Sequence, residues 1–219
     1  MGLAKDMSYR SKQHGLPLKA KRIVDLIVSF ALLMAFSPVL FAIGTLLFLT
    51  MGCPILFRQQ RAGRYGRPFI VYKFRTMTDD RDAQGQLVPD KERLTRVGRL
   101  LRLFSVDELP QLWNVLRGDM SLVGPRPLLM QYMERYSLAE MRRHEVKPGI
   151  TGWAQVNGRN AVTWPERFAL DVWYVEHWSP ALDAWIFLQT PWKMAMRTGI
   201  SHAGHATMPE FLRSEGDKP

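Results

Sequence analysis

The sequence has little cysteine, because Cys53 is the single one among 219 residues. One cysteine excludes a disulfide within the chain and any metal site built from several cysteines. The sequence therefore carries no mark of an oxidising compartment, and we expect the soluble part to lie in the cytoplasm. No base partner for Cys53 is implied, so we expect it to be a small buried residue.

Acidic residues are scarce compared with basic ones. The chain has 20 Asp plus Glu against 30 Lys plus Arg, a formal charge of +10, which suits phosphorylated substrates, acidic lipid or nucleic acid. The basic residues are scattered among turn motifs and form no stripe, which argues against a nucleic-acid partner. The chain also lacks internal repeats and any break in composition, so we expect one domain plus a membrane segment.

Only one long apolar run is present, residues 23–49, interrupted by Asp25, Ser29, Ser37 and Thr45. As a continuous helix it would be roughly 40 Å long, which is enough for a bilayer. We do not expect a secretory signal, because the run is longer than a typical signal core and no A-x-A cleavage site follows it.

Ser37 and Pro38 lie in the middle of this run. Proline removes a backbone hydrogen bond, and the serine hydroxyl can bond to a carbonyl that the proline leaves free. A kinked spanning helix is one interpretation. The flanks 1–22 and 50–75 are both basic, however. Basic flanks favour the cytoplasmic side of a membrane, and both flanks lie on that side only if the segment enters and leaves by the same membrane face. We therefore expect a re-entrant membrane helix over 23–49, broken at Ser37 and Pro38.

The remaining chain predicts a compact α+β domain that is mostly helical. A small β-hairpin is expected from strands at 55–59 and 69–77 around a glycine-rich turn. We assign the catalytic domain to residues 50–208 and a C-terminal tail to 209–219. Helical patterns are expected over residues 94–103, 106–116, 128–145, 165–177 and 180–196.

The last of these helices, 180–196, is apolar but contains Pro191 and is too short to span a bilayer. Amphipathic helices of this kind often lie in the membrane interface, where tryptophan is favoured. Packing on the core explains the spacing equally well. The seven tryptophans of the chain favour the interface.

Two adjacent carboxylates, Asp107 and Glu108, lie at an expected helix start. A structural role is open, because Ser105 and Glu108 have the S-x-x-E spacing of a capping box. A helix N-terminus also attracts phosphate, and Arg99 and Arg102 would support an anionic substrate. The same place can therefore hold a substrate and a nucleophile.

Two turn-rich segments are further candidates. Arg126 lies between two prolines, which would restrict a guanidinium that grips phosphate, although a rigid surface turn explains the pattern equally well. The glycine-punctuated polar loop 149–159 suits nucleotide or sugar contacts, but it matches no Walker or dinucleotide fingerprint.

Taken together, six ordered blocks resemble the monotopic phosphoglycosyl transferases over residues 19–208. Within that family the sequence is most similar to the members that transfer bacillosamine phosphate. The blocks are S-P at 37–38, Y-K-F-R-T-M at 72–77, D-E-L-P-Q-L at 107–112, G-D-M-S at 118–121, G-P-R-P at 124–127 and K-P-G-I-T-G-W at 147–153.

The resemblance implies a two-step reaction with magnesium. Asp107 would attack the phosphorus next to the sugar of a UDP-sugar, expel UMP and keep the sugar phosphate on its carboxylate, which undecaprenyl phosphate then takes. Asp107 would also bind Mg²⁺, and Glu108 would assist as proton acceptor or metal neighbour. The substrate-binding residues implied are Lys73, Arg75, Arg102, Arg126, Arg159 and Asp171.

The chemistry agrees, since a carboxylate is a competent nucleophile toward phosphorus when cations neutralise the phosphates. The expected sugar donor is UDP-N,N'-diacetylbacillosamine or a related N-acetylated amino sugar. The expected location is the cytoplasmic face of a bacterial inner membrane, and the expected process is the first membrane step of glycoconjugate assembly.

Two other functions remain open at this point. Asp80 and Asp82 have the D-x-D form of metal-dependent glycosyltransferases, so the chain could transfer a sugar without phosphate and release UDP. A membrane-anchored basic module that binds nucleic acid is the second alternative.

Overall fold

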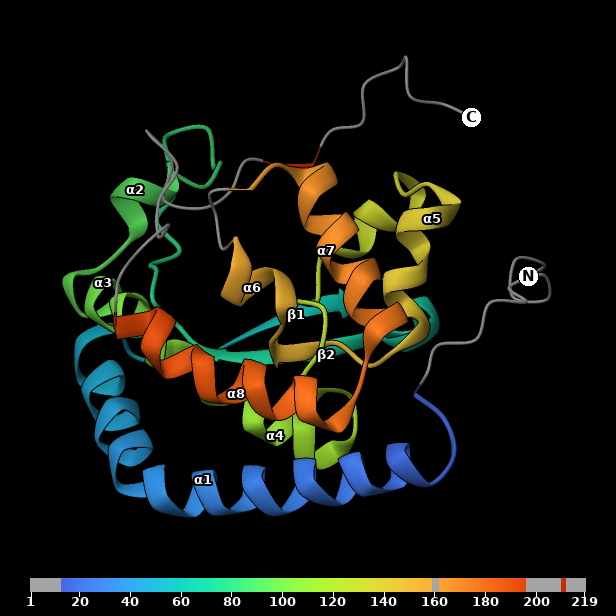
Figure 1. Cartoon of the computed structure of the whole chain (residues 1–219). Coiled ribbons are helices and arrows are strands. Elements are labelled where there is room, and N and C mark those ends of the chain that lie inside the picture. Colours follow the sequence, from blue (N-terminus) through green and yellow to red (C-terminus); the bar gives the residue numbers. More distant parts are fainter. Residues whose placement is uncertain (1–12, 159–161, 196–209, 212–219) are drawn as a thin grey trace.

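The computed structural model describes residues 13–158, 162–195 and 210–211. Within them the chain is mostly helical, as expected (Figure 1). It has two small sheets, of which only the antiparallel hairpin was predicted. In chain order the elements are α1 (Gly15–Met51), β1 (Leu56–Ala62), η1 (Arg64–Gly66), β2 (Pro68–Phe74), α2 (Asp90–Arg93), α3 (Arg96–Leu103), η2 (Val106–Glu108), α4 (Gln111–Arg117), β3 (Ser121–Val123), η3 (Met130–Glu134), α5 (Leu138–Met141), η4 (Arg142–Glu145), β4 (Gly149–Thr151), α6 (Trp153–Asn157), α7 (Trp164–His177) and α8 (Pro180–Ala195).

The first sheet is the expected β-hairpin. β1 and β2 pair antiparallel, from Leu56 opposite Phe74 to Ala62 opposite Pro68. β1 extends beyond the predicted 55–59, because its pairing continues up to the turn.

The hydrophobic core lies where the hairpin, α4, β3, α7 and α8 meet. β3 and β4 form a parallel pair in which Ser121 lies opposite Gly149. A side chain at Gly149 would overlap the backbone of Gly124, so this close approach requires glycine. The buried apolar side chains include Val71, Leu112, Val115, Met120, Leu122, Val123, Val146, Val175 and Ile186.

The helix prediction over 94–103 is confirmed by α3, whereas the segments 106–116 and 128–145 are each divided into shorter helices. α7 and α8 match the patterns at 165–177 and 180–196. The single helix expected over 128–145 is instead divided into η3, α5 and η4. Ser137 explains the division, because it adopts an extended backbone and forms a capping box with Glu140 that starts a new helix.

α1 is long enough and apolar enough to cross a membrane, and it changes direction part-way along its length (Figure 1). We attribute the bend to Pro38, which lies inside the helix and cannot donate a hydrogen bond to Met34. The Ser37 hydroxyl donates to that same carbonyl of Met34 at 2.8 Å. This confirms the expected serine bond, which satisfies the carbonyl that Pro38 leaves free.

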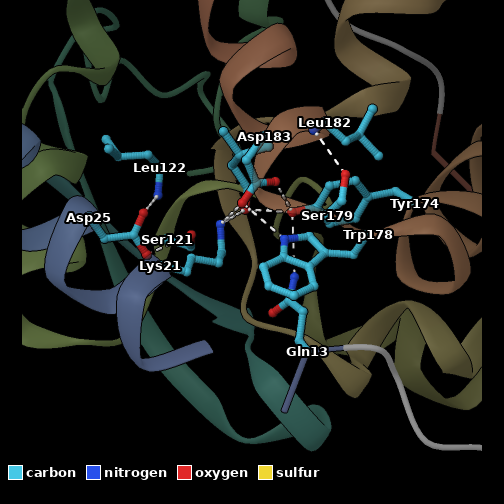
Figure 2. Close-up of polar contacts among 11 residues, drawn as sticks. Gln13, Lys21, Asp25, Ser121, Leu122, Tyr174, Trp178, Ser179, Leu182 and Asp183 are labelled. Carbon is cyan, nitrogen blue, oxygen red and sulfur yellow. Dashed lines mark hydrogen bonds and ion pairs between the residues drawn. The ribbon is translucent and has the colours of Figure 1, made fainter. Parts of the chain in front are cut away.

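The first arm of α1 is attached to the domain by charged side chains. Asp25 is buried within the apolar run, where it accepts bonds from the Ser121 hydroxyl at 2.8 Å and the Leu122 backbone at 3.1 Å (Figure 2). Arg22 donates to the carbonyls of Val115 and Leu116, which lie in the last turn of α4. α1 therefore satisfies backbone groups of both β3 and α4.

Asp183 of α8 completes this attachment (Figure 2). Its carboxylate pairs with Lys21 at 2.5 Å and accepts bonds from Tyr174 at 2.7 Å and Trp178 at 3.0 Å. Lys21 also donates to the Val123 carbonyl at 3.1 Å. The basic residues at 21 and 22 thus bind the domain itself, in addition to marking a positive flank.

α8 has one buried side and one exposed side. Ile186 is fully buried in the core, so the packing interpretation of this helix is correct for its inner side. Trp185, Leu188 and Trp192 are exposed. An exposed apolar side is what an interfacial helix needs.

Cys53 lies in the turn between α1 and β1, and its side chain is exposed. The prediction of a buried residue is therefore wrong. Connecting turns lie on the surface of a domain, and this placement outweighs the apolar character of cysteine.

Candidate active site

Asp107 and Glu108 lie in the short 3₁₀ turn η2, between α3 and α4. The expected capping box is absent, because the Ser105 side chain caps no helix and its backbone is left-handed at φ 52°. α4 starts only at Gln111, so the pair does not lie at the N-terminus of an α-helix either. Helix capping therefore does not explain the two carboxylates.

Glu108 is held by two cations from distant segments. Arg126 donates to both carboxylate oxygens, at 2.6 and 3.2 Å, and Lys73 of β2 donates at 2.6 Å. Burial alone would raise the pKa of Glu108, but the charges of Arg126 and Lys73 outweigh burial and hold the pKa well below its usual range. Glu108 is therefore a fixed anion.

Asp107 is different from its neighbour. Only 8% of the residue is exposed, and among the described residues none forms a hydrogen bond with its carboxylate. Burial, followed by the charge of Glu108, raises its pKa, while Lys73 and Arg102 act in the opposite direction. Asp107 is thus a carboxylate without a fixed partner that lies among cations.

Two of the other predicted cations lie differently. Arg102 donates to the Thr76 hydroxyl at 3.0 Å and interacts electrostatically with Asp107. It is therefore one of the cations that surround Asp107. Arg75 instead pairs with Asp79 at 2.7 Å and bonds to the Met77 carbonyl, and neither contact brings it to Asp107 or Glu108. Arg159 lies outside the described residues.

Asp171 lies behind the site and not at its surface. It is 1% exposed and pairs with Arg143, which is 2% exposed, at 2.7 Å. The same Arg143 donates to the Arg126 carbonyl at 2.8 Å. Sequence reasoning missed Arg143, because its R-R-H-E setting is polar and looks like solvent-exposed helix.

Arg61 is a second residue that sequence reasoning missed. It lies near the end of β1 and bridges to Leu129, close to the loop that carries Arg126. Burial, followed by the neighbouring charge of Arg126, lowers its pKa to about 10. The strand pattern alone gave no signal that Arg61 faces the other cations.

The loop expected at 149–159 is partly regular structure, since β4 and α6 lie within it. Gly152 allows the chain to pass close to Gly124, because a side chain at Gly152 would overlap its backbone. This segment therefore packs closely against the start of the loop that carries Arg126.

The donor set suits magnesium held jointly with a substrate. Among residues 13–158, 162–195 and 210–211, no group of three or more His, Cys, Asp or Glu side chains converges. Magnesium commonly binds through one or two carboxylates plus substrate phosphates, and the Asp107 carboxylate, which has no fixed partner, fits that mode. Bound there, the ion would neutralise phosphate charge.

The family model of the bacterial sugar transferases matches residues 17–197. The chain belongs to the bacterial sugar transferase family. It is 53% identical over 194 residues to the uncharacterized sugar transferase EpsL of Bacillus subtilis (strain 168), covering 89% of this chain and 96% of that protein.

Two further relatives have more specific names. The UDP-glucose:undecaprenyl-phosphate glucose-1-phosphate transferase of Klebsiella pneumoniae is 43% identical over 195 residues, which are 84% of this chain and 42% of that protein. The UDP-N-acetylgalactosamine-undecaprenyl-phosphate N-acetylgalactosaminephosphotransferase of Aeromonas hydrophila is 39% identical over 178 residues, or 78% of this chain and 42% of that protein. This sugar transferase therefore matches less than half the length of either relative.

Proposed function

We propose that this chain transfers a sugar 1-phosphate from a UDP-sugar to undecaprenyl phosphate and releases UMP. Membership of the family and the names of the relatives support a sugar-phosphate transferase. The proposed mechanism rests on the different surroundings of the two adjacent carboxylates. Glu108 is fixed by Lys73 and Arg126, whereas Asp107 has no fixed partner among the same cations.

The proposed reaction has two displacements at one phosphorus. In the first, an Asp107 oxygen bonds to the phosphorus that carries the sugar, the bond to the bridging oxygen breaks, and UMP leaves with the electron pair. In the second, a phosphate oxygen of the lipid bonds to that phosphorus, and the bond to Asp107 breaks, which restores the carboxylate. Lys73, Arg102 and Arg126 would stabilise the charge that develops on the phosphate oxygens.

Glu108 has a different part in this proposal. A carboxylate with a lowered pKa is a poor proton acceptor near neutral pH, so the assignment as general base is disfavoured. Its contacts instead orient Lys73 and Arg126 beside Asp107.

The sugar is to be identified by assay. Purified enzyme, undecaprenyl phosphate and magnesium would be tested with UDP-diacetylbacillosamine, UDP-N-acetylgalactosamine and UDP-glucose. UMP release with one of these donors supports the proposal. UDP release would instead support a glycosyltransferase that uses Asp80 and Asp82.

Arg126 gives a prediction at the site. Arg126→Lys keeps the charge but loses the two-pronged contact with Glu108, so kcat/KM for UMP release should fall by about 10- to 100-fold. Arg117→Lys, at an exposed position on α4, is the matched control and should leave kcat/KM unchanged. Wild-type turnover in Arg126→Lys would show that the loop is only a turn.

We also propose that α1 enters and leaves the membrane by the cytoplasmic face. The bend at Pro38, the basic flanks and the exposed apolar side of α8 support this arrangement. The exposed Cys53 reports on the second flank, and Lys12→Cys in a Cys53→Ser background reports on the first. Neither thiol should react with an impermeant reagent on intact cells, and labelling of one flank would contradict the re-entrant model.

Pro38→Ala extends this topology test. Alanine restores the backbone donor to the Met34 carbonyl, so α1 should straighten and some molecules should span the membrane. Thiol labelling from outside should then appear on one flank. Ser37→Ala is the control for local packing, since it removes the hydroxyl but leaves the proline in place.

A further inference from the structure

Arg143 and Asp171 form a buried ion pair between η4 and α7. The Arg143 Nε and Nη2 atoms lie 3.0 and 2.7 Å from the same oxygen of Asp171. A buried pair of this kind carries a large desolvation cost, and well-packed apolar residues are often as stable. Its contribution to stability alone therefore does not explain the pair.

The pair has a second contact that leads to the site. Arg143 Nη2 also donates to the backbone carbonyl of Arg126 at 2.8 Å. On the other side of that residue, the Pro125 carbonyl accepts a bond from Gly149 at 3.0 Å. Pro125 and Pro127 have no backbone donor, so the loop is fixed largely through its carbonyls. Two bonds thus hold the backbone on either side of Arg126.

We infer that Arg143 and Asp171 are positioning residues that hold the Arg126 backbone where its guanidinium meets Glu108. Asp171 fixes Arg143, Arg143 fixes the carbonyl of Arg126, and the side chain of Arg126 fixes Glu108. Asp171 therefore acts through the loop and not by contact with the substrate. The kinetic arm of the test below rests on the proposed function.

The test replaces the pair with apolar residues of similar size. Arg143→Met/Asp171→Leu avoids an unpaired buried charge, so the enzyme should fold, as thermal unfolding would verify. The variant lacks the donor to the Arg126 carbonyl, so the Arg126 guanidinium should be slightly displaced. A displacement of this kind should lower kcat/KM for UMP release by about 10- to 100-fold. Glu176→Gln on α7 weakens a neighbouring ion pair with Arg142, which keeps Glu145 as its partner, and should change kcat/KM by less than about twofold.

The decisive measurement repeats the replacement of the pair in an Arg126→Ala background. If the pair acts through Arg126, the replacement should cost less than about threefold there. A loss as large as that in the wild-type background would mean direct substrate contact or a general structural role, and it would overturn the inference.

A readout without turnover separates this inference from the proposed function. Amide hydrogen exchange over residues 121–129 should be faster in Arg143→Met/Asp171→Leu than in the wild type, because the carbonyl bond to the loop is gone. Unchanged protection of this segment would overturn the positioning role, whatever the enzyme transfers. Absence of UMP release by the wild type would overturn only the proposed function.

Discussion

Asp107→Asn is expected to abolish UMP release, with a loss on the order of 10⁴-fold or more. An amide cannot serve as the anionic nucleophile, and Asp107 is the carboxylate that no described residue fixes by a hydrogen bond. With UDP-sugar and magnesium but no lipid, the wild type should release close to one equivalent of UMP. Mass spectrometry should then find one sugar phosphate on the peptide that contains residue 107, and Asp107→Asn should show neither product.

Glu108→Gln is the matched variant, because it makes the same change one residue later. The amide keeps the shape of the carboxylate but weakens the contacts with Lys73 and Arg126, so activity should fall by about 10²-fold and labelling should persist. The opposite pattern, with Asp107→Asn active and Glu108→Gln unlabelled, would reverse the two roles. Normal turnover without UMP release before lipid addition would favour direct transfer.

Acid is expected to destabilise this protein through His144. Burial, followed by the charge of Arg143, lowers the pKa of His144 from 6.5 to about 3. Below pH 6.5 the unfolded chain binds a proton that the folded chain does not, so stability falls as pH falls toward 3. Between pH 6.5 and 4.5 this one group should remove ~2 to 3 kcal/mol from the free energy of unfolding.

His144→Gln tests this expectation by denaturant unfolding across that pH range. His144 Nδ1 lies 3.1 Å from the Gly63 carbonyl, and the glutamine amide can donate to the same oxygen without titrating. The acid loss in the variant should be smaller by the same ~2 to 3 kcal/mol. His177→Gln, at an exposed position, makes the same substitution away from this buried site and is the control for the change of residue type.

Local interactions made much of the fold predictable. The Ser37 hydroxyl bond and the Pro38 interruption depend on residues within one helical turn. The hairpin followed from two apolar strands and a glycine-rich turn, and α7 followed from its 3.6-residue periodicity. In each case the neighbours in sequence supply most of the determining contacts.

The failures involve partners that are distant in sequence. The S-x-x-E spacing at Ser105 predicted a capping box, but the Glu108 carboxylate is bound by Lys73 and Arg126, which are 35 and 18 residues away. A local sequence pattern does not show that distant cations will bind a carboxylate in place of the expected helix cap. Arg143 was missed for the same reason, since only the fold brings it to Asp171 and the Arg126 carbonyl.

The attachment of α1 also sets an order of events during synthesis. Lys21 is separated from Asp183 by 162 residues, and Asp25 is separated from Ser121 by 96. The helix therefore leaves the ribosome long before its partners exist, and these charges must stay hydrated until β3 and then α8 are made. A first arm that stays in contact with water meets that requirement, and α8 then closes the structure around it.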